Sequence, residues 1–393
     1  MAEKRGIASA PVHGRRVLVR VDFNVPLDAS GRIADDRRMH EAMPTLNHLR
    51  ASGARTILLS HLGRPDGKRD PRFSLRPVAH HLSEMLGQPV SFAEDIVGSR
   101  PLELATKLAN GQFLMLENLR FQPGEEANDP GFAAQLANLG QVFIEDAFGT
   151  VHRAHASTVG VPQRLPAFAG LLVEREVREL SKLTEAPARP YAVLVGGAKV
   201  ADKLPLLTSF LGRADSLLIG GALAFPFLHA KEVKLGATPV EGGLKEAVDE
   251  FFQKASASGT QVILPTDLVV ERPGTTETST HEVGHLPPGT LARDVGPETR
   301  ARFSEVLSRS KTVFWNGPLG LAEDSRFSAG TREVLAQLGQ VPGYHVAAGG
   351  DSARIAQDLG VAGGFQFIST GGGAALEFVE GLELPGLAVL PDA

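Results

Sequence analysis

The chain has 393 residues, of which 42% are hydrophobic and 22% are charged, and its formal net charge is −5. This length exceeds one typical compact core and predicts two or three domains. Cysteine is absent, which excludes a disulfide framework and thiol chemistry and fits a cytoplasmic location. The N-terminus has no apolar segment of the signal-peptide type, and the longest apolar stretch, 217–228, is interrupted by glycine and proline. We therefore expect neither export nor a membrane-spanning helix.

Charge differs slightly between the two halves of the chain. Residues 1–170 contain 20 Lys+Arg and 18 Asp+Glu, which gives +2, so the remaining 20 Lys+Arg and 27 Asp+Glu give −7. An asymmetry of this size is too small for a nucleic-acid surface. It is compatible with a small anionic ligand on the first half of the chain.

The first half alternates strand-like and helix-like segments. Apolar runs of strand length lie at 16–21, 56–59, 113–116 and 142–144, and helical spacing is found at 77–86 and 132–139. Such alternation is typical of βαβ units around a parallel sheet, in which ligands bind outside the carboxyl ends of the strands.

Basic and polar residues follow each of these four strands. They are Arg20, Asp22 and Asn24; His61 and Arg64; Asn118 and Arg120; and Asp146, His152 and Arg153. A single surface arginine usually contacts only water. Because three separate loops of one sheet edge supply Arg64, Arg120 and Arg153, we expect the guanidinium groups to converge on a phosphate or carboxylate. Arg38 lies in a helix-like segment after Asp35 and Asp36, where an exposed ion pair is the simpler interpretation.

A helix is predicted over 171–186, where apolar residues form one stripe and Pro187 and Pro190 follow. We place the connection between two domains here.

The second half repeats a strand, a glycine turn and a helix. In 193–203 (VLVGGAKVADK) a buried strand runs into Gly196 and Gly197, and Lys199 and Lys203 follow one helical turn apart, so both can face one anion. A tight turn with two solvated lysines is the alternative. Further clusters lie at Gly220–Gly221, at Gly349–Ser352 and at Gly371–Gly373, and Asn316 and Glu323 flank another strand end. Together they favour an extended anion and nucleotide site, with Asp351 placed to contact a metal ion held by phosphates.

Residues 281–285 read HEVGH, which matches the H-E-x-x-H pattern of zinc proteases. That pattern functions only on a helix. The flanking sequence and Gly284 favour a surface loop, so we do not expect a zinc site. For His152 and His155, anion contacts or core positions are favoured over metal ligation.

Eight segments in order now identify a family resemblance. They are RVLVRVDFNVP, SHLGRPDGKRDPRFSL, LENLRF, EDAFGTVHRAHAST, GGAKVADK, FWNGPLG, GGDS and STGGGAALE. They resemble the successive signature segments of phosphoglycerate kinase and span nearly the whole chain.

The resemblance implies two Rossmann-like, doubly wound parallel-sheet α/β domains joined by a hinge helix, with a cleft between them. The implied boundaries are 1–170 for the phosphoglycerate-binding domain, 171–187 for the hinge helix and 188–373 for the nucleotide-binding domain, and the tail 374–393 is expected to pack back on the first domain. The implied activity is reversible, Mg²⁺-dependent phosphoryl transfer between 1,3-bisphosphoglycerate and ADP by a monomer, after domain closure. Neither nucleic acid nor a membrane is expected as a partner.

The resemblance also implies site residues. The phosphoglycerate contacts would be Asp22, Phe23, Asn24, Arg38, His61, Leu62, Gly63, Arg64, Arg120 and Arg153. The nucleotide contacts would be Gly197, Lys199, Lys203, Gly220, Gly221, Ala292, Asn316, Glu323, Gly349, Gly350, Asp351 and Ser352, with Asp351 on magnesium. Arg38, Lys203 and the backbone N–H groups of Gly350 and Gly373 would offset charge on the transferring group.

Some positions depart from the family pattern. Ala292 and Arg293 stand where glycine and leucine are usual beside the adenine, Pro226 replaces a usual threonine, and Leu223 replaces a usual methionine. The alternatives are an NAD-dependent dehydrogenase, for which the early G-x-G-x-x-G turn is absent, and a non-catalytic phosphate-binding protein on the same scaffold.

Overall fold

The computed structural model describes residues 3–28 and 30–393. The chain forms two compact units, one with the residues up to Arg178 together with Glu383–Ala393 and the other with Glu179–Leu382. The sequence predicts boundaries after residues 170, 187 and 373. The division of the structure falls instead inside helix α6 (Leu171–Thr184), because this helix begins in the first unit and ends in the second.

The first unit contains a six-stranded parallel sheet in the order β3-β4-β2-β1-β5-β6. Its strands are β1 (Arg16–Arg20), β2 (Arg55–Leu59), β3 (Val90–Phe92), β4 (Phe113–Met115), β5 (Val142–Glu145) and β6 (Ala167–Ala169). Its helices are α1 (Arg37–Ala51), α2 (Arg76–Leu86), α3 (Ser99–Lys107), α4 (Pro123–Glu126), α5 (Pro130–Ala137), most of α6, and α14 (Pro385–Ala388). Short helical turns include η3 (Leu119–Phe121), η4 (Phe148–Thr150) and η5 (Ala156–Gly160).

The central strands of this sheet are buried on both faces. In β1 the residues after Arg16 are all buried, and the strand pairs in parallel with β2 and β5. Val17 and Val19 join the core formed with α1 and α2, whereas Leu18 and Arg20 face the opposite side. A continuous apolar run is typical of such strands. The charged Arg20 in this position therefore requires buried partners.

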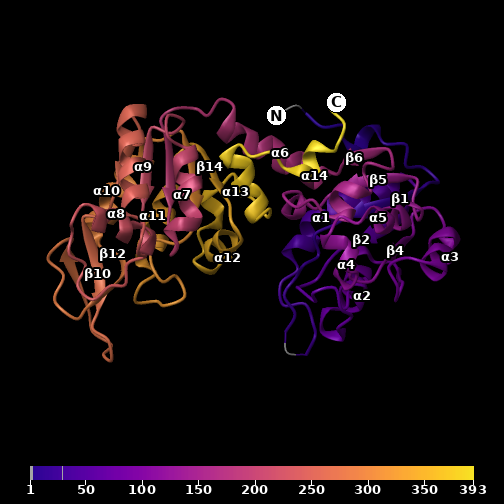
Figure 1. Cartoon of the computed structure of the whole chain (residues 1–393), viewed down its shortest axis with the longest axis horizontal. Coiled ribbons are helices and arrows are strands. Elements are labelled where there is room, and N and C mark those ends of the chain that lie inside the picture. Colours follow the sequence, from indigo (N-terminus) through magenta and orange to yellow (C-terminus); the bar gives the residue numbers. More distant parts are fainter. Residues whose placement is uncertain (1–2, 29) are drawn as a thin grey trace. The chain divides into compact units, whose positions relative to one another are not determined.

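Residues from both ends of the chain meet in the first unit. Arg5 N donates to Pro391 O over 2.9 Å, and Lys4 Nζ lies 2.7 Å from Asp392 Oδ1. Figure 1 shows α14, drawn in yellow, lying next to α6. The chain thus returns to its first unit from Glu383 onward.

The second unit contains another six-stranded parallel sheet, in the order β15-β14-β13-β7-β8-β9. Its strands are β7 (Tyr191–Val195), β8 (Ser216–Ile219), β9 (Gln261–Ile263), β13 (Thr312–Asn316), β14 (Tyr344–Ala347) and β15 (Phe367–Ile368). Its helices are α7 (Val200–Ser209), α8 (Ala224–Ala230), α9 (Lys245–Ser258), α10 (Pro297–Ser308), α11 (Ala329–Leu338), α12 (Gly350–Asp358) and α13 (Gly373–Glu380). The short turn η6 (Gly221–Leu223) precedes α8.

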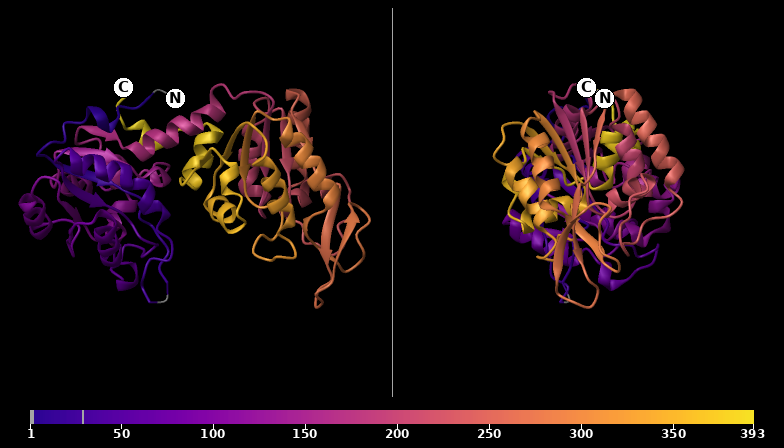
Figure 2. Two further views of the ribbon diagram at one scale, coloured as in Figure 1. Left: turned by 180° about the vertical axis from the view of Figure 1, so that it is seen from behind. Right: turned by 90° about the vertical axis from the view of Figure 1, so that its left-hand side faces the viewer.

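Helices cover both faces of this second sheet (Figure 2). Residues of α10, α11 and α12 form one core with Leu194 and Trp315. On the other face, Phe210 at the end of α7 packs against Tyr191 and Phe314 with ring centroids 6.0 and 5.4 Å apart. Both units are therefore doubly wound, and the predicted α/β class with parallel sheets is confirmed.

A three-stranded antiparallel sheet extends the second unit and is absent from the sequence prediction. It has the order β11-β10-β12, from β10 (Asp267–Glu271), β11 (Thr278–Glu282) and β12 (Leu291–Val295). The H-E-x-x-H segment begins in β11 and ends in a turn, so the predicted surface loop is wrong for His281 and Glu282. A strand places alternate side chains on opposite faces, so the segment lacks the helix that a zinc-protease site requires. In the described part of the chain, no helix is long and apolar enough to cross a membrane.

Candidate active site

Arg20 is the centre of a polar network at the carboxyl ends of the first sheet. The side chain is buried, and its Nε donates to Ser157 Oγ over 2.9 Å while Nη1 donates to Val21 O over 2.5 Å. Nη2 lies 3.0 Å from His61 Nδ1. A guanidinium has donors only, so Nδ1 of His61 must accept this hydrogen bond. The contact thus selects the neutral imidazole.

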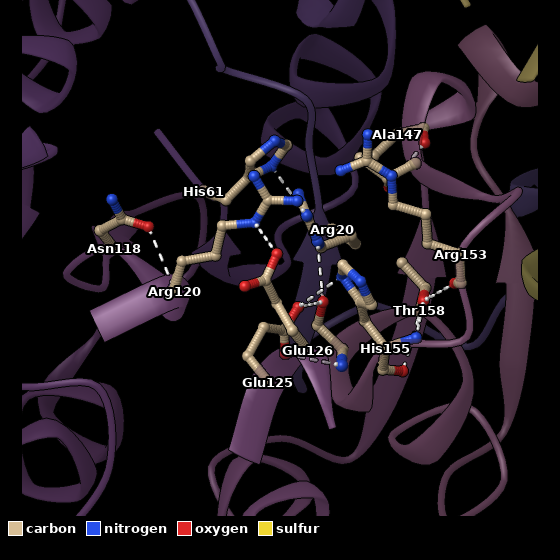
Figure 3. A network of polar contacts seen from close by, with 12 residues as sticks. Arg20, His61, Asn118, Arg120, Glu125, Glu126, Ala147, Arg153, His155 and Thr158 are labelled. Carbon is tan, nitrogen blue, oxygen red and sulfur yellow. Dashed lines mark hydrogen bonds and ion pairs between the residues drawn. The ribbon is translucent and has the colours of Figure 1, made fainter. Parts of the chain in front are cut away.

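His61 lies among several cationic side chains. Figure 3 shows Arg20 and Arg120 with their guanidinium groups turned toward the imidazole. Burial, followed by the positive charges of Arg20, Arg120, Arg153 and Arg38, holds the pKa of His61 well below its ordinary range. Of the three arginines that the sequence predicts to converge, Arg120 and Arg153 act on this buried ring and Arg64 does not. A cluster of guanidinium groups of this kind is suited to an anionic ligand.

Backbone and amide contacts fix the loops that carry these groups. Arg120 Nη1 donates to Gly63 O over 2.8 Å, and Gly63 N donates to Asn24 Oδ1 over 2.9 Å. Asn118 Oδ1 accepts from Leu62 N over 3.2 Å, and its Nδ2 donates to Leu62 O over 2.7 Å. The loops after β1, β2 and β4 are therefore tied together around the pocket.

Arg38 is the second residue of α1 and pairs with Asp22 rather than with its neighbours in sequence. Its Nη1 lies 2.8 Å from Asp22 Oδ2, and the arginine side chain remains 34% exposed. Arg37 pairs with Asp35 instead. The simple interpretation of Arg38 as a solvated local ion pair is therefore wrong, because the carboxylate of Asp22 draws it toward the loop after β1.

Arg64 differs from the other arginines of the prediction. Its side chain is exposed, and within residues 3–28 and 30–393 no hydrogen bond connects it to the network around His61. Phe23, by contrast, is fully buried, and its N–H donates to Ser60 Oγ over 3.0 Å. Phe23 thus acts as core under the pocket, while Arg64 is free to approach from solvent.

Two buried carboxyl groups, those of Glu125 and Glu145, interact with Arg20. Glu125 accepts from Ser157 Oγ over 2.5 Å and from Ser157 N over 3.0 Å. Burial raises the pKa of Glu125, and it raises the pKa of Glu145 well above the ordinary range. Asp146 Oδ1 accepts from Leu172 N over 3.0 Å, at the first turn of α6. The acidic side chain after β5 therefore anchors the helix that leaves the first unit.

Replacing His152 with glutamine should make the protein less sensitive to acid, because the histidine destabilises the folded state at low pH. Burial and the neighbouring Arg153 lower the pKa of His152 from 6.5 to about 4. Between these values the unfolded chain binds a proton that the folded chain does not, so the histidine contributes a loss of stability as pH falls. As pH falls from about 7.5 to about 5, the free energy of unfolding of His152→Gln should rise by about 1 kcal/mol relative to that of wild type, allowing for solvent screening.

Urea unfolding of both proteins across this pH range measures the difference. Glutamine can still accept the hydrogen bond that Arg153 Nε donates to His152 Nε2 over 3.1 Å. A stability difference that stays constant with pH would contradict the assigned protonation of His152.

In the second unit, glycine backbones meet at the carboxyl ends of β7, β8 and β13. A Cβ on Gly196 would lie 2.0 Å from Pro318 O, and one on Gly221 would lie 2.9 Å from the same oxygen. Gly197 has φ +116°, and a Cβ there would meet nothing within 4 Å. Its N–H donates to Pro318 O over 2.9 Å and its carbonyl accepts from Leu223 N over 2.8 Å, so Gly197 joins the ends of β7, β8 and β13.

Lys203 and Asn316 form the polar centre of this edge. Lys203 Nζ donates to Asn316 Oδ1, and burial lowers the pKa of Lys203. Asn316 Nδ2 donates to Ala348 O over 2.6 Å, and Ser352 Oγ accepts from Gly317 N over 3.0 Å. The turn between β14 and α12 is thereby fixed against the end of β13.

Lys199 departs from the predicted arrangement. It is the exposed N-cap of α7 and has extended backbone geometry, with φ −107° and ψ 114°. The helix begins at Val200, whose N–H donates to Glu241 Oε2 over 2.7 Å. The two lysines therefore do not share one helical face, because the earlier one precedes the helix.

A pocket of 640 Å³ in the second unit is lined by several residues of the nucleotide prediction. These are Gly197, Gly221, Ala292, Glu323 and Asp351. Gly220, Lys199, Lys203, Asn316, Gly349, Gly350 and Ser352 are not among its lining residues. The structure thus brings the predicted base and ribose contacts into one pocket, next to the glycine turns.

The carboxylate of Asp351 is placed where it could contact a metal ion that is bound to a nucleotide. It is the second residue of α12, and its side chain is 84% exposed. Among the described residues, no group of three His, Cys, Asp or Glu side chains could hold a metal ion. Asp351 Oδ1 lies 4.0 Å from Arg354 Nη2, and an exposed carboxylate beside glycine turns fits Mg²⁺, which is usually held by one or two carboxylates together with substrate phosphates.

Gly349→Ala should destabilise the second unit by about 1–3 kcal/mol, because the residue has a backbone conformation that favours glycine. Its φ is +107°, and a Cβ would lie 2.3 Å from Asn316 Nδ2. Gly350→Ala is the matched control, since a Cβ at that helical position meets nothing within 4 Å. Thermal unfolding of both variants gives the comparison. If the two variants unfold at the same temperature, the turn at Gly349 accommodates a side chain without loss of stability, and the prediction is wrong.

Sequence reasoning missed several residues that the structure places at these sites. Arg20, Glu125 and Ser157 form a hydrogen-bonded group in the first unit, and Thr238 and Arg354 line the pocket of the second unit, but the sequence patterns predict a site role for none of them. The signal for Arg20 is its position in a strand of otherwise apolar residues, because an arginine buried in a sheet needs partners. The other residues give no such signal, since only the fold brings them near the pockets.

The fold and these sites define a doubly wound α/β protein with a cluster of cationic side chains in its first unit and a glycine-lined pocket in its second. A family model described as phosphoglycerate kinase matches residues 7–382. The chain therefore belongs to the phosphoglycerate kinase family.

Individual relatives cover almost the whole chain. Phosphoglycerate kinase of Coprothermobacter proteolyticus is 45% identical over 387 residues, which are 98% of either chain. That of Herpetosiphon aurantiacus is 44% identical over 391 residues and 99% of either chain. The solved structure of phosphoglycerate kinase from Coxiella burnetii has a TM-score of 0.89 at 34% identity and that from Pyrococcus horikoshii 0.85 at 31%, each covering 98% of both chains.

Proposed function

We propose that this protein catalyses the phosphoglycerate kinase reaction, the reversible transfer of the acyl phosphate of 1,3-bisphosphoglycerate to ADP. The products are 3-phosphoglycerate and ATP. Family membership over residues 7–382 is the observation that carries the proposal. The cationic cluster around His61 in the first unit and the glycine-lined pocket of the second would bind the two substrates.

In this proposal the first unit binds the phosphoglycerate. Its phosphate and carboxylate groups carry several negative charges, and the pocket around His61 is surrounded by Arg20, Arg38, Arg120 and Arg153. Arg64 is exposed and would engage the ligand from the solvent side. Asp22 and Asn24 hold Arg38 and the loop of Gly63 in place, so their side chains orient the binding groups.

The second unit binds the nucleotide. Its base and ribose would occupy the pocket lined by Ala292 and Glu323, and its phosphates would lie at the start of α12, next to Asp351. Backbone N–H groups at glycine turns and at helix N-termini are well suited to phosphate oxygens. Asp351 would contact a magnesium ion that arrives with the nucleotide and neutralises phosphate charge.

The reaction requires positioning and charge compensation rather than a general base. In the direction of ATP consumption, a carboxylate oxygen of 3-phosphoglycerate attacks the terminal phosphorus, and the bond from that phosphorus to the β-phosphate oxygen breaks. The attacking group is already an anion, so no proton is transferred. Arg38 and Lys203 would stabilise the charge on the transferring group, with the N–H groups of Gly350 and Gly373.

Because the two substrates bind to different units, transfer requires a conformational step that brings them together. We place this step at α6, which the two compact units share. Exclusion of water on closure would protect the acyl phosphate from hydrolysis. We further propose that the protein acts as a monomer in the cytoplasm.

The decisive experiment measures ATP consumption in the presence of 3-phosphoglycerate and Mg²⁺. A coupling enzyme that oxidises NADH reports the rate. We expect no rate when either 3-phosphoglycerate or Mg²⁺ is omitted. A folded protein that binds nucleotide but transfers no phosphate would overturn the proposal and leave a phosphate-binding protein on the same scaffold. The dehydrogenase alternative, which family membership disfavours, predicts NADH oxidation without the coupling enzyme.

A further inference from the structure

A charged side chain lies on an otherwise apolar part of the nucleotide pocket. Arg293 lines this part together with Phe225, Pro239, Ala292 and Leu321. It is the third residue of β12, and its strand neighbours on either side are buried while its own side chain is 32% exposed. Since side chains alternate along a strand, Arg293 projects away from the core.

The backbone around Arg293 is fixed on both sides. Leu321 N donates to Arg293 O over 3.2 Å, and Ala292 N donates to Thr238 Oγ1 over 2.9 Å. These bonds join β12 to two loops that line the same pocket. The position of the arginine is therefore set by the fold of the second unit alone.

Glu271 holds the guanidinium group. Arg293 Nε lies 2.6 Å from Glu271 Oε1, and the glutamate side chain is only 15% exposed. The two residues lie on the paired strands β12 and β10, which are shown at the edge of the unit in Figure 1 and have a register shift at Val269/Val270. The contact uses Nε, so the four N–H groups on Nη1 and Nη2 are not required for it.

We propose that Arg293 reads the nucleotide base and favours 6-oxopurines, namely guanine and hypoxanthine, over adenine. This inference rests on the proposed function, which assigns the pocket to the nucleotide. A guanidinium offers donors and no acceptor, and guanine presents two adjacent acceptors, O6 and N7. Adenine presents a donor amino group in place of O6. The match between arginine and base is therefore better for the 6-oxopurine.

The other side chains on this part of the wall cannot supply the same selection. Phe225, Pro239, Ala292 and Leu321 carry no polar group, and they contact a base through its faces and edges without distinguishing its functional groups. The Thr238 hydroxyl accepts a backbone hydrogen bond from Ala292 N, and its single O–H cannot provide the pair of donors that a guanidinium offers. Glu271 acts as a positioning residue, because it orients Arg293 and is not among the residues that line the pocket.

The test compares GDP with ADP, each with Mg²⁺, by titration calorimetry on the full-length protein. We expect wild type to bind GDP at least as tightly as ADP. In Arg293→Met, which keeps the length but removes the donors, the ratio of GDP to ADP affinity should fall about tenfold, as for loss of one bidentate contact to a base. Glu271→Gln should lower the same ratio to a smaller extent, since the arginine is then less firmly oriented.

Arg272→Met is the matched control, because Arg272 is exposed, carries the same charge and follows Glu271 in the chain. It should leave the ratio unchanged. If Arg293→Met does not fold, Arg293→Lys and Glu271→Gln decide the question. Lysine keeps the charge but not the planar pair of donors, so most of the preference should be lost.

Two results would overturn the inference: an unchanged GDP to ADP ratio in the Arg293 variants, or an equal loss of affinity for both nucleotides. The outcome is separable from that of the proposed function, since binding is measured without turnover. If the wild type transfers phosphate but the GDP to ADP ratio does not depend on Arg293, the proposed function stands and the inference about Arg293 fails. If the ratio depends on Arg293 but the protein transfers no phosphate, the inference stands and the proposed function fails.

Discussion

Arg38→Ala should lower kcat by about a thousandfold or more, the effect typical of an arginine that stabilises charge on a transferring phosphoryl group. The guanidinium lies at the first turn of α1 and is held 2.8 Å from Asp22 Oδ2. It is one third exposed, so part of the group faces the space where a ligand would bind. Coupled assays at saturating ATP and 3-phosphoglycerate give kcat, and circular dichroism checks the fold.

Arg37→Ala is the matched control for this variant, since Arg37 precedes Arg38 on the same helix and pairs with Asp35. Its kcat should stay close to that of wild type. Arg38→Lys should recover only part of the rate, because a single ammonium cannot reproduce the planar fork. Comparable losses in the Arg37 and Arg38 variants would assign the effect to α1 stability instead of charge compensation.

Lys203→Met should lower kcat by about a hundred- to a thousandfold while KM for ATP changes little, because the charge is needed most as the phosphoryl group transfers. Lys203 is half-buried, its pKa is lowered by burial, and its Nζ is held by Asn316. A desolvated, fixed ammonium interacts more strongly with a nearby anion than a solvated one does. Steady-state kinetics with varied ATP separate the two parameters.

Lys245→Met serves as the control for Lys203, since Lys245 is exposed on α9 and pairs with Asp249. We expect wild-type kinetics from it. If Lys203→Met instead raised KM with kcat unchanged, the lysine would contribute only to ground-state binding. The assignment of Lys203 to the transferring group would then be wrong.

The sequence determined the class of fold and the position of the strand-to-helix turns along the chain. Apolar runs such as 142–144 predict strands buried on both faces, and the structure has β5 there. Gly196–Gly197 and Gly349–Gly350 predict strand-to-helix turns, and the structure has β7 before α7 and β14 before α12. These predictions succeed because burial pattern and glycine conformation are local properties, and because parallel topology gathers the strand ends at one edge.

The tertiary structure alone decided which side chains meet. Arg20 contacts His61 and Ser157, which are 41 and 137 residues away in sequence, and Arg38 pairs with Asp22 instead of the nearer Asp35 or Asp36. Distances of this kind depend on loop paths and sheet order, which no local pattern specifies.

The antiparallel sheet that carries Arg293 and Glu271 is likewise not evident from a local sequence pattern. Its strand β11 is almost wholly exposed, so it has no apolar run that would reveal it in the sequence. Backbone pairing with β10 defines this strand. Local burial and backbone preference therefore decided the elements of the two parallel sheets, while long-range pairing decided β11. Long-range contacts also decided the chemistry at each site, because a charged group takes its partner from whichever segment the fold places beside it.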